Sequence, residues 1–136
     1  MTSDTAIATV LKFEQLINTR KAEAVCSLLT DDSVLIDSLG GRVEGPVKLR
    51  SAWEGYFKWV PDYTISHEEI FADGNTVAMF GMAQGTYTAD GQIKKENFWK
   101  TPAAWRAMVK NDKIAEWQVF ADNEPIRAIM RRASGS

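Results

Sequence analysis

The chain has 136 residues, of which 45% are hydrophobic and 25% are charged, which is typical of one globular domain. Its formal net charge is −2, and its basic residues are scattered apart from Arg127, Arg131 and Arg132, so we expect no nucleic-acid partner. The first ten residues lack a basic start and a continuous apolar run, which argues against a secretory signal, a membrane span or a membrane partner and favours a cytoplasmic protein.

The first half of the chain has the 3.6-residue apolar periodicity of helices. It predicts a helix over residues 4–19, a short one over 21–29 and a third over 47–59. Gly45-Pro46 marks the start of the third helix, where Pro is best tolerated. Between the second and third helices, the apolar residues 34–36 predict a buried strand that ends at Asp37.

After Pro61 the periodicity changes from 3.6 to two, which is typical of strands. Turn signals at 73–75, 89–91 and 111–112 separate three or four long strands, which predicts a curved antiparallel meander. Helices followed by a meander indicate an α+β fold whose helices cover one face of the sheet. We expect a single domain over residues 1–136, with residues 131–136 disordered.

Asp37 is the first candidate for chemistry, because a carboxylate that follows three apolar residues is costly unless it is solvated, paired or used. One hypothesis makes it a buried general base that moves a proton on a bound substrate. The other makes it a solvated acid in an Asx turn, which the neighbouring Ser38 and Gly40 suit.

His67 is the only histidine and the second catalytic candidate. It alternates in register with the apolar Tyr63, Ile65 and Phe71, so we expect it to face the same pocket and reach Asp37. A histidine beside an aspartate suits acid–base chemistry near neutral pH, whereas a lone strand histidine is more often just packed or exposed.

The chain offers no metal site, since one histidine and one cysteine without ligand spacing leave too few soft donors. We likewise expect no cofactor, because no glycine-rich phosphate loop is present. Cys26 sits among apolar helix residues and is interpreted as a small core residue.

Aromatic residues are the candidates for a ligand pocket. Trp105 and Trp117 alternate with small residues in the last strands, so their rings either shape a cavity or simply pack in the core. The predicted substrate-contacting set, chosen for an inward position, is Phe13, Trp53, Phe57, Met79, Gly81, Trp105, Trp117 and Val119. The opposite register carries Arg106, Met108, Gln118 and Phe120, a mixed face that fits a sheet-to-sheet homodimer.

Two segments carry a resemblance to a known family: TDDSVLIDSLGGRVEGPVKLRSAW, with an acid-bearing strand before a helix, and PAAWRAMVKNDKIAEWQVFADNEPI, with the last hairpin. Over almost its whole length the chain resembles the nuclear transport factor 2-like superfamily, in particular its SnoaL-like and ketosteroid-isomerase-like branch. The resemblance implies a cystatin-like architecture, in which three N-terminal helices cover a cone-shaped curved antiparallel sheet around a deep apolar pocket.

The same resemblance places Asp37 at the position of the general base in ketosteroid isomerases. Phe13 and Trp105 stand where that branch has the oxyanion tyrosine and the second acid, which argues against true ketosteroid isomerase activity. Val119 stands in the triad position of limonene epoxide hydrolases, so that triad is not expected either. SnoaL-type polyketide cyclases need only one acid–base group and a shaped apolar cavity.

The sequence therefore predicts a cofactor-free proton-transfer enzyme that acts on a small hydrophobic molecule, as an isomerase, cyclase or dehydratase, with Asp37 as the base. The alternative is a non-catalytic domain of the same fold that binds a ligand or mediates dimerisation.

Overall fold

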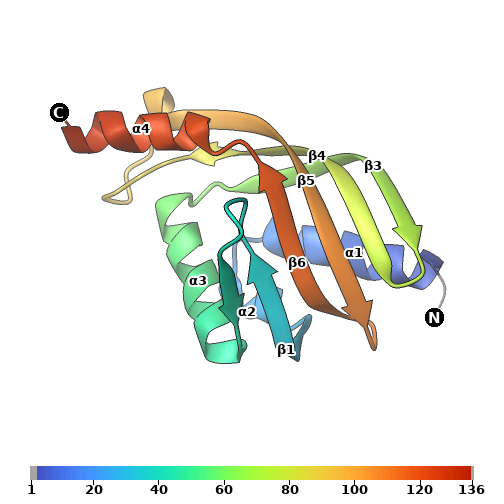
Figure 1. Ribbon diagram of the computed structural model, residues 1–136. Coiled ribbons are helices and arrows are strands. Elements are labelled where there is room, and N and C mark those ends of the chain that lie inside the picture. The colour runs from blue at the N-terminus through green and yellow to red at the C-terminus, as the bar shows by residue number, and fades with distance from the viewer. Residues whose placement is uncertain (1–2, 136) are drawn as a thin grey trace.

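A curved six-stranded sheet forms the centre of the molecule, with strand order β2-β1-β6-β5-β4-β3 (Figure 1). The computed structural model describes residues 3–135. The strands are β1 (Leu29–Ile36), β2 (Arg42–Glu44), β3 (Thr64–Asp73), β4 (Thr76–Thr86), β5 (Phe98–Lys110) and β6 (Lys113–Ala121). The predicted α+β class with a curved sheet is confirmed.

One pair of strands departs from the predicted antiparallel meander. β1 runs parallel to β6, with Leu35 beside Trp117, whereas the other neighbouring pairs are antiparallel. A parallel pair needs a long connection between its strands, and here α3 and the β3–β5 meander supply it. This pairing brings the end of β1, and with it Asp37, against the last hairpin.

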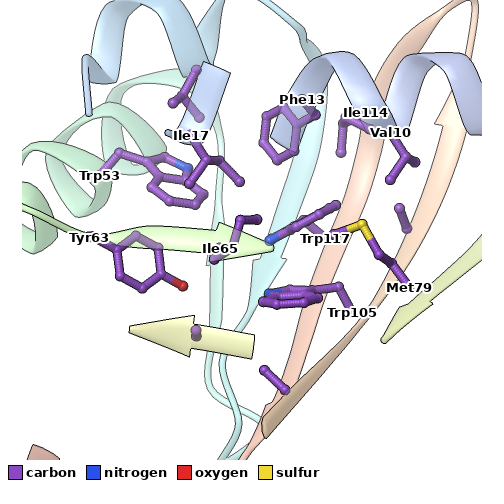
Figure 2. Packing of buried hydrophobic residues seen from close by; sticks show 14 of the residues in the cluster. Val10, Phe13, Ile17, Trp53, Tyr63, Ile65, Met79, Trp105, Ile114 and Trp117 are labelled. Atoms are coloured by element: carbon purple, nitrogen blue, oxygen red, sulfur yellow. The ribbon is translucent and has the colours of Figure 1, made fainter. Parts of the chain in front are cut away.

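Helix α1 (Ser3–Ile17) lies across the strands β3–β6 (Figure 1). Its buried face repeats at helical spacing through Ala6, Val10, Phe13 and Ile17. Phe13 meets the ring of Trp117 edge to face, with 4.8 Å between ring centroids. Figure 2 shows these side chains between the helix and the sheet.

Two further helices cover the β1–β2 side of the sheet. α2 (Ala22–Cys26) is short and packs on α3 (Pro46–Trp59), which in turn contacts β1 and β2. Gly45 precedes α3 with φ of 90°, a conformation that glycine adopts without strain, and Pro46 opens the helix as predicted. Trp53 and Phe57 on the buried face of α3 point into the core.

A β-bulge interrupts β3 between His67 and Glu69. Before the bulge Tyr63 and Ile65 are buried, but beyond it the alternation is reversed: Ile70 packs on the core and Phe71 is 56% exposed. The predicted unbroken alternation over residues 63–71 is therefore wrong, because the bulge adds a residue to the strand.

The C-terminal segment forms a fourth helix, α4 (Glu124–Gly135). Oδ1 of Asp122 accepts the N–H of Glu124 at 2.9 Å and caps its start, while Ile129 is buried against the core. Residues 131–135, expected to be disordered, belong to this helix, and Ser136 lies outside the described residues. Within residues 3–135 no helix combines the length and apolarity needed to cross a membrane.

Candidate functional site

A cavity of about 310 Å³ lies between α3, the end of β1 and the inner face of the sheet. Its size falls at the lower end of the range of small-molecule sites. Six aromatic side chains line it: Trp53, Tyr56, Tyr63, Trp99, Trp105 and Trp117. The polar members of the lining are Asp37, Ser38, Thr101 and Asn123, and the others are Leu35, Gly41, Val43, Ala52, Ala83, Val119 and Ala121.

The alternation of β5 and β6 builds the inner wall. Along β5 every second residue from Trp99 to Val109 is buried, which turns Trp99, Thr101 and Trp105 to the same face. Trp105 and Trp117 stack at 6.3 Å between ring centroids and 26° between planes. Ala83 and Ala121, which pair with Thr101 and Ala103 further along β5, also line the cavity, and their small side chains leave it open there.

Asp37 lies at the rim of this cavity and is exposed to solvent. Its Oδ1 accepts the backbone N–H groups of Leu39 and Gly41, each at 2.9 Å, in the Asx turn that follows β1. Oδ2 makes no hydrogen bond to any residue of the described chain. The hypothesis of a buried base is therefore wrong in its burial, because the carboxylate is solvated and fixed through only one oxygen.

Gly41 allows the carboxylate to hold this position. A Cβ at Gly41 would lie 2.6 Å from Oδ2 of Asp37, closer than two such atoms approach one another. A second contact holds the rim together across the chain, since Nδ2 of Asn123 donates to Oγ of Ser38. This bond joins the turn after β1 to the segment between β6 and α4.

Two tyrosines face the cavity from the α3 side. Tyr56 and Tyr63 meet edge to face at 4.9 Å between ring centroids. Burial raises the pKa of Tyr63 well above its ordinary value, with a further contribution from Tyr56, and burial also raises the pKa of Tyr56. Both hydroxyls therefore stay protonated, and able to donate, at neutral pH.

Trp99 carries an unusual polar atom. Within the described residues, its Nε1 is the one fully buried side-chain nitrogen or oxygen without a hydrogen-bond partner. An unpaired buried donor costs about 1–3 kcal/mol, which the packing of the ring against Tyr63, at 6.2 Å between centroids, must offset.

His67 lies elsewhere, on the α1 side of β3. Its Nδ1 is bonded to the carboxylate of Glu14, at 2.8 Å from Oε1 and 2.9 Å from Oε2, and it does not line the cavity. The expectation that His67 reaches Asp37 is therefore wrong. The Glu14 side chain is only 10% exposed, so the pair fastens α1 to β3.

The predicted substrate-contacting residues divide into two groups. Trp53, Trp105, Trp117 and Val119 lie on the cavity wall. Phe13, Phe57 and Met79 are buried in the packed core away from the cavity. Gly81 does not widen the cavity, because a Cβ there would lie 1.9 Å from the carbonyl oxygen of Ser66, where the bulged strand comes close.

Several lining residues escaped the sequence analysis. Trp99 and Thr101 belong to the same every-second-residue series of β5 as Ala103 and Trp105. The two-residue period of the strand therefore indicated that they face inward. Tyr56 lies one turn after Trp53 in α3, at the spacing that shares a helix face. Asn123 follows the last strand and had no such signal. Across the described residues, no three His, Cys, Asp or Glu side chains group as metal ligands.

Comparison with known proteins agrees with this architecture. A putatively assigned polyketide cyclase structure from Xanthomonas campestris superposes with a TM-score of 0.80 at 16% identity, covering 93% of this chain and 98% of the other. A structure described as a candidate SnoaL-like polyketide cyclase, from Jannaschia, superposes with a TM-score of 0.79 at 16% identity. The match covers 98% of this chain and 94% of the other. A protein with a ketosteroid-isomerase-like fold from Catenulispora acidiphila, in complex with trimethylamine, superposes with a TM-score of 0.76 at 12% identity. The match covers 88% of this chain and 89% of the other.

At these identities the likeness shows the fold alone. No curated protein sequence matches the chain closely enough to count as a relative. The family model of the SnoaL-like domain matches residues 10–117, which run from the middle of α1 to the middle of β6. Because this match spans most of the chain, the protein belongs to the SnoaL-like domain family of the nuclear transport factor 2-like superfamily.

Proposed function

We propose that the protein is a proton-transfer enzyme that acts on a small hydrophobic molecule without a cofactor, as an isomerase, a dehydratase or a cyclase like those named among its structural neighbours. Asp37 serves as the base. The observation that carries the proposal is the position of its carboxylate, which stands at the rim of an aromatic cavity with Oδ1 fixed by two N–H groups and Oδ2 open.

The geometry suits a general base. A fixed carboxylate needs no reorganisation before it takes a proton, and a substrate seated against the indoles presents its edge to the rim. Solvent at the rim lets Asp37 return or exchange the proton. His67 takes no part in this proposal, because Glu14 holds its ring.

The base can be tested without the natural substrate. 5-Nitrobenzisoxazole is a small neutral aromatic that opens when a base removes its ring proton, breaking the N–O bond and releasing a yellow phenolate. We expect the protein to catalyse this opening, and Asp37→Asn to lower kcat about a hundredfold with KM unchanged.

Asp90 offers a matched control. Its Oδ1 also accepts a backbone N–H in an exposed turn, from Gln92 at 2.9 Å, but Asp90 is not among the residues that line the cavity. Asp90→Asn should leave the rate unchanged. Equal rates for the Asp37→Asn variant and the unmodified protein would refute the proposal.

One observation favours a second candidate function. Asp37 is exposed and serves its own Asx turn, as a purely structural aspartate does. In that case the cavity binds a ligand without converting it. Ligand binding without any Asp37-dependent turnover is the result that supports this second function.

We also propose a homodimer formed through the outer face of the sheet. Phe80 of β4 and Phe120 of β6 flank Ala104 of β5 in one row across the strands, and they are 45% and 50% exposed. Phe71 extends the row, with 6.3 Å between its ring centroid and that of Phe80. A second copy of the chain offers the same aromatic row, so each copy covers the other's exposed rings.

A further inference from the structure

The rings that line the cavity give it a charge preference. Every aromatic residue of the lining is a tryptophan or a tyrosine. The face of an aromatic ring carries partial negative charge, and the indole of tryptophan attracts a cation more strongly than the other aromatic side chains do. A wall built from such faces therefore favours a positive ligand even where no wall residue is ionised.

Trp105 turns one of its two faces to the open space. Its other face is covered by Trp117, which stacks on it at 26° between planes and pairs with Ala107 one step along the sheet. In the opposite direction along the strands, the next inward pair is Ala103 and Ala121. Because two alanines are too small to cover an indole, this face of Trp105 is available to a ligand.

Further rings approach the same space from other directions. Tyr63 lies 6.2 Å from Trp99 between ring centroids, with 37° between their planes, and 4.9 Å from Tyr56 at 86°. Figure 2 shows Trp53 and Tyr63 on one side and the two stacked indoles on the other. Rings set at several angles around one space are the arrangement that surrounds a cation.

The ionised groups of the lining have the same preference. No lysine or arginine lines the cavity, whereas the carboxylate of Asp37 does. Its Oδ2 makes no hydrogen bond to any described residue, so it is available to a positive ligand. A cation that leaves water loses its hydration, and a carboxylate nearby offsets part of that cost, while an anion is repelled by it.

The other polar groups of the lining decide which kind of cation fits. A primary ammonium group brings three N–H donors, each of which needs an acceptor. Ser38 and Asn123 are bonded to each other, and the hydroxyl of Thr101 donates to backbone carbonyl oxygens, which leaves the open oxygen of Asp37 as the strongest acceptor. A methylated ammonium group has one N–H or none, and its apolar methyl groups suit a wall of rings.

We infer that the cavity binds a small tertiary or quaternary ammonium ion, whose methyl groups lie against the rings of Trp105 and Tyr63 and whose charge is balanced by Asp37. The volume of about 310 Å³ leaves room for a trimethylammonium group with a short substituent. The inference goes beyond the proposed function, because binding of the cation requires no proton transfer.

Two probes of nearly the same shape isolate the effect of the charge. Choline carries a trimethylammonium group, and 3,3-dimethyl-1-butanol replaces its nitrogen with carbon. We expect the unmodified protein to bind choline about tenfold more tightly than the neutral alcohol, measured by isothermal titration calorimetry.

Trp105→Leu removes the ring and keeps an apolar side chain. It should weaken the binding of choline about tenfold and that of the alcohol about twofold at most. Phe98→Leu is the matched control, since it removes a ring from the exposed outer face of the same strand and should change neither affinity. Asp37→Asn removes the balancing charge and should weaken the binding of choline about threefold, with no change for the alcohol.

Three results would overturn the inference: equal or tighter binding of the alcohol by the unmodified protein, no binding of choline, or a choline affinity that neither Trp105→Leu nor Asp37→Asn lowers selectively. None of them decides the proposed function, because 5-nitrobenzisoxazole is neutral and its opening tests the base alone. A protein that binds choline but shows no Asp37-dependent opening would keep this inference and lose the proposed proton transfer.

Discussion

Gly41 both holds and frees the carboxylate of Asp37: its backbone N–H donates to Oδ1 at 2.9 Å, and its missing side chain leaves Oδ2 uncovered. The same two residues are joined a second time, since the N–H of Asp37 donates to the carbonyl oxygen of Gly41, also at 2.9 Å. Together with the N–H of Leu39, which also donates to Oδ1, these bonds fix the direction of the open oxygen by backbone contacts rather than by burial.

Gly41→Ala should therefore displace the carboxylate. The new Cβ would lie 2.6 Å from Oδ2, so the side chain of Asp37 must rotate away. We expect the rate of 5-nitrobenzisoxazole opening to fall about tenfold or more, because a base misplaced by about an ångström loses much of its effect. The measurement is kcat for the variant against the unmodified protein at the same pH.

Gly55→Ala is the control for the loss of a glycine. Gly55 lies inside α3, and a Cβ there meets no atom within 4 Å. Alanine in a helix interior stabilises by about 0.5–1 kcal/mol relative to glycine, so this variant should be more stable to urea and equally active. A rate unaffected by Gly41→Ala would show that the position of the carboxylate does not matter to turnover.

The pair of Glu14 and His67 should matter to stability and not to turnover. His67→Ala leaves the buried carboxylate of Glu14 without its partner, which we expect to lower the free energy of unfolding by about 1–2 kcal/mol. When His67→Ala is made in a protein that already carries Glu14→Gln, it should lower the free energy of unfolding by less than it does in the unmodified protein. The reason is that the two residues act as one unit. Urea unfolding of the two single variants and the double variant measures this coupling.

The opposite result is clear-cut. Loss of 5-nitrobenzisoxazole turnover in a folded His67→Ala variant, comparable with the loss in Asp37→Asn, would show that the histidine reaches the substrate after all. Glu68→Gln, an exposed neighbour on the same strand, should change neither stability nor turnover.

Alkaline pH should destabilise the protein through its two buried tyrosines. A tyrosine in the unfolded chain loses its proton near pH 10, while burial raises the pKa of Tyr56 and Tyr63 in the folded chain. Above pH 10 the unfolded state therefore binds fewer protons than the folded state, and the free energy of unfolding falls by about 1.4 kcal/mol per pH unit for each tyrosine.

Urea unfolding between pH 9 and 11 measures this slope. Tyr63→Phe and Tyr56→Phe should each remove one tyrosine's share of it, while leaving the stability below pH 9 less affected. If both variants lose unfolding free energy with pH as steeply as the unmodified protein, the tyrosine hydroxyls are not shielded from solvent.

The three N-terminal helices, the long strands after Pro61 and the tight turns were predictable because each depends on nearby residues. Gly74 and the pair Asn111-Asp112 adopt positive φ values at the tips of the two hairpins, as their residue types predict. The bulge at His67 was not predictable in this way, since it depends on the close approach of Gly81 from the neighbouring strand. The parallel pairing of β1 with β6 joins residues about eighty positions apart and leaves no local pattern.

The candidate site shows the same division. The alternation of β5 and β6 predicted the inward position of Trp105, Trp117 and Val119, and it extended to Trp99. Whether an inward side chain lines a hollow or fills the core depends on its neighbours across the sheet, and here Met79 and Phe13 lie away from the cavity whereas Tyr63 lines it. The partner of His67 lies on α1, fifty-three positions away, and only the folded chain reveals it.

The dimer proposal predicts that a charge in the aromatic row separates the subunits. Ala104 lies directly between Phe80 and Phe120, so a carboxylate in Ala104→Glu would be buried without a partner against the second copy. Sedimentation should show the unmodified protein as a dimer at micromolar concentration and this variant as a monomer.

Gln84→Glu is the control. It adds the same charge to the outer face of β4, beside Lys100 and away from the aromatic row, and this variant should stay dimeric. An unmodified protein that sediments as a monomer at all concentrations, or a dimer that survives Ala104→Glu, would contradict the proposal, because no other row of exposed rings crosses the described strands on that face.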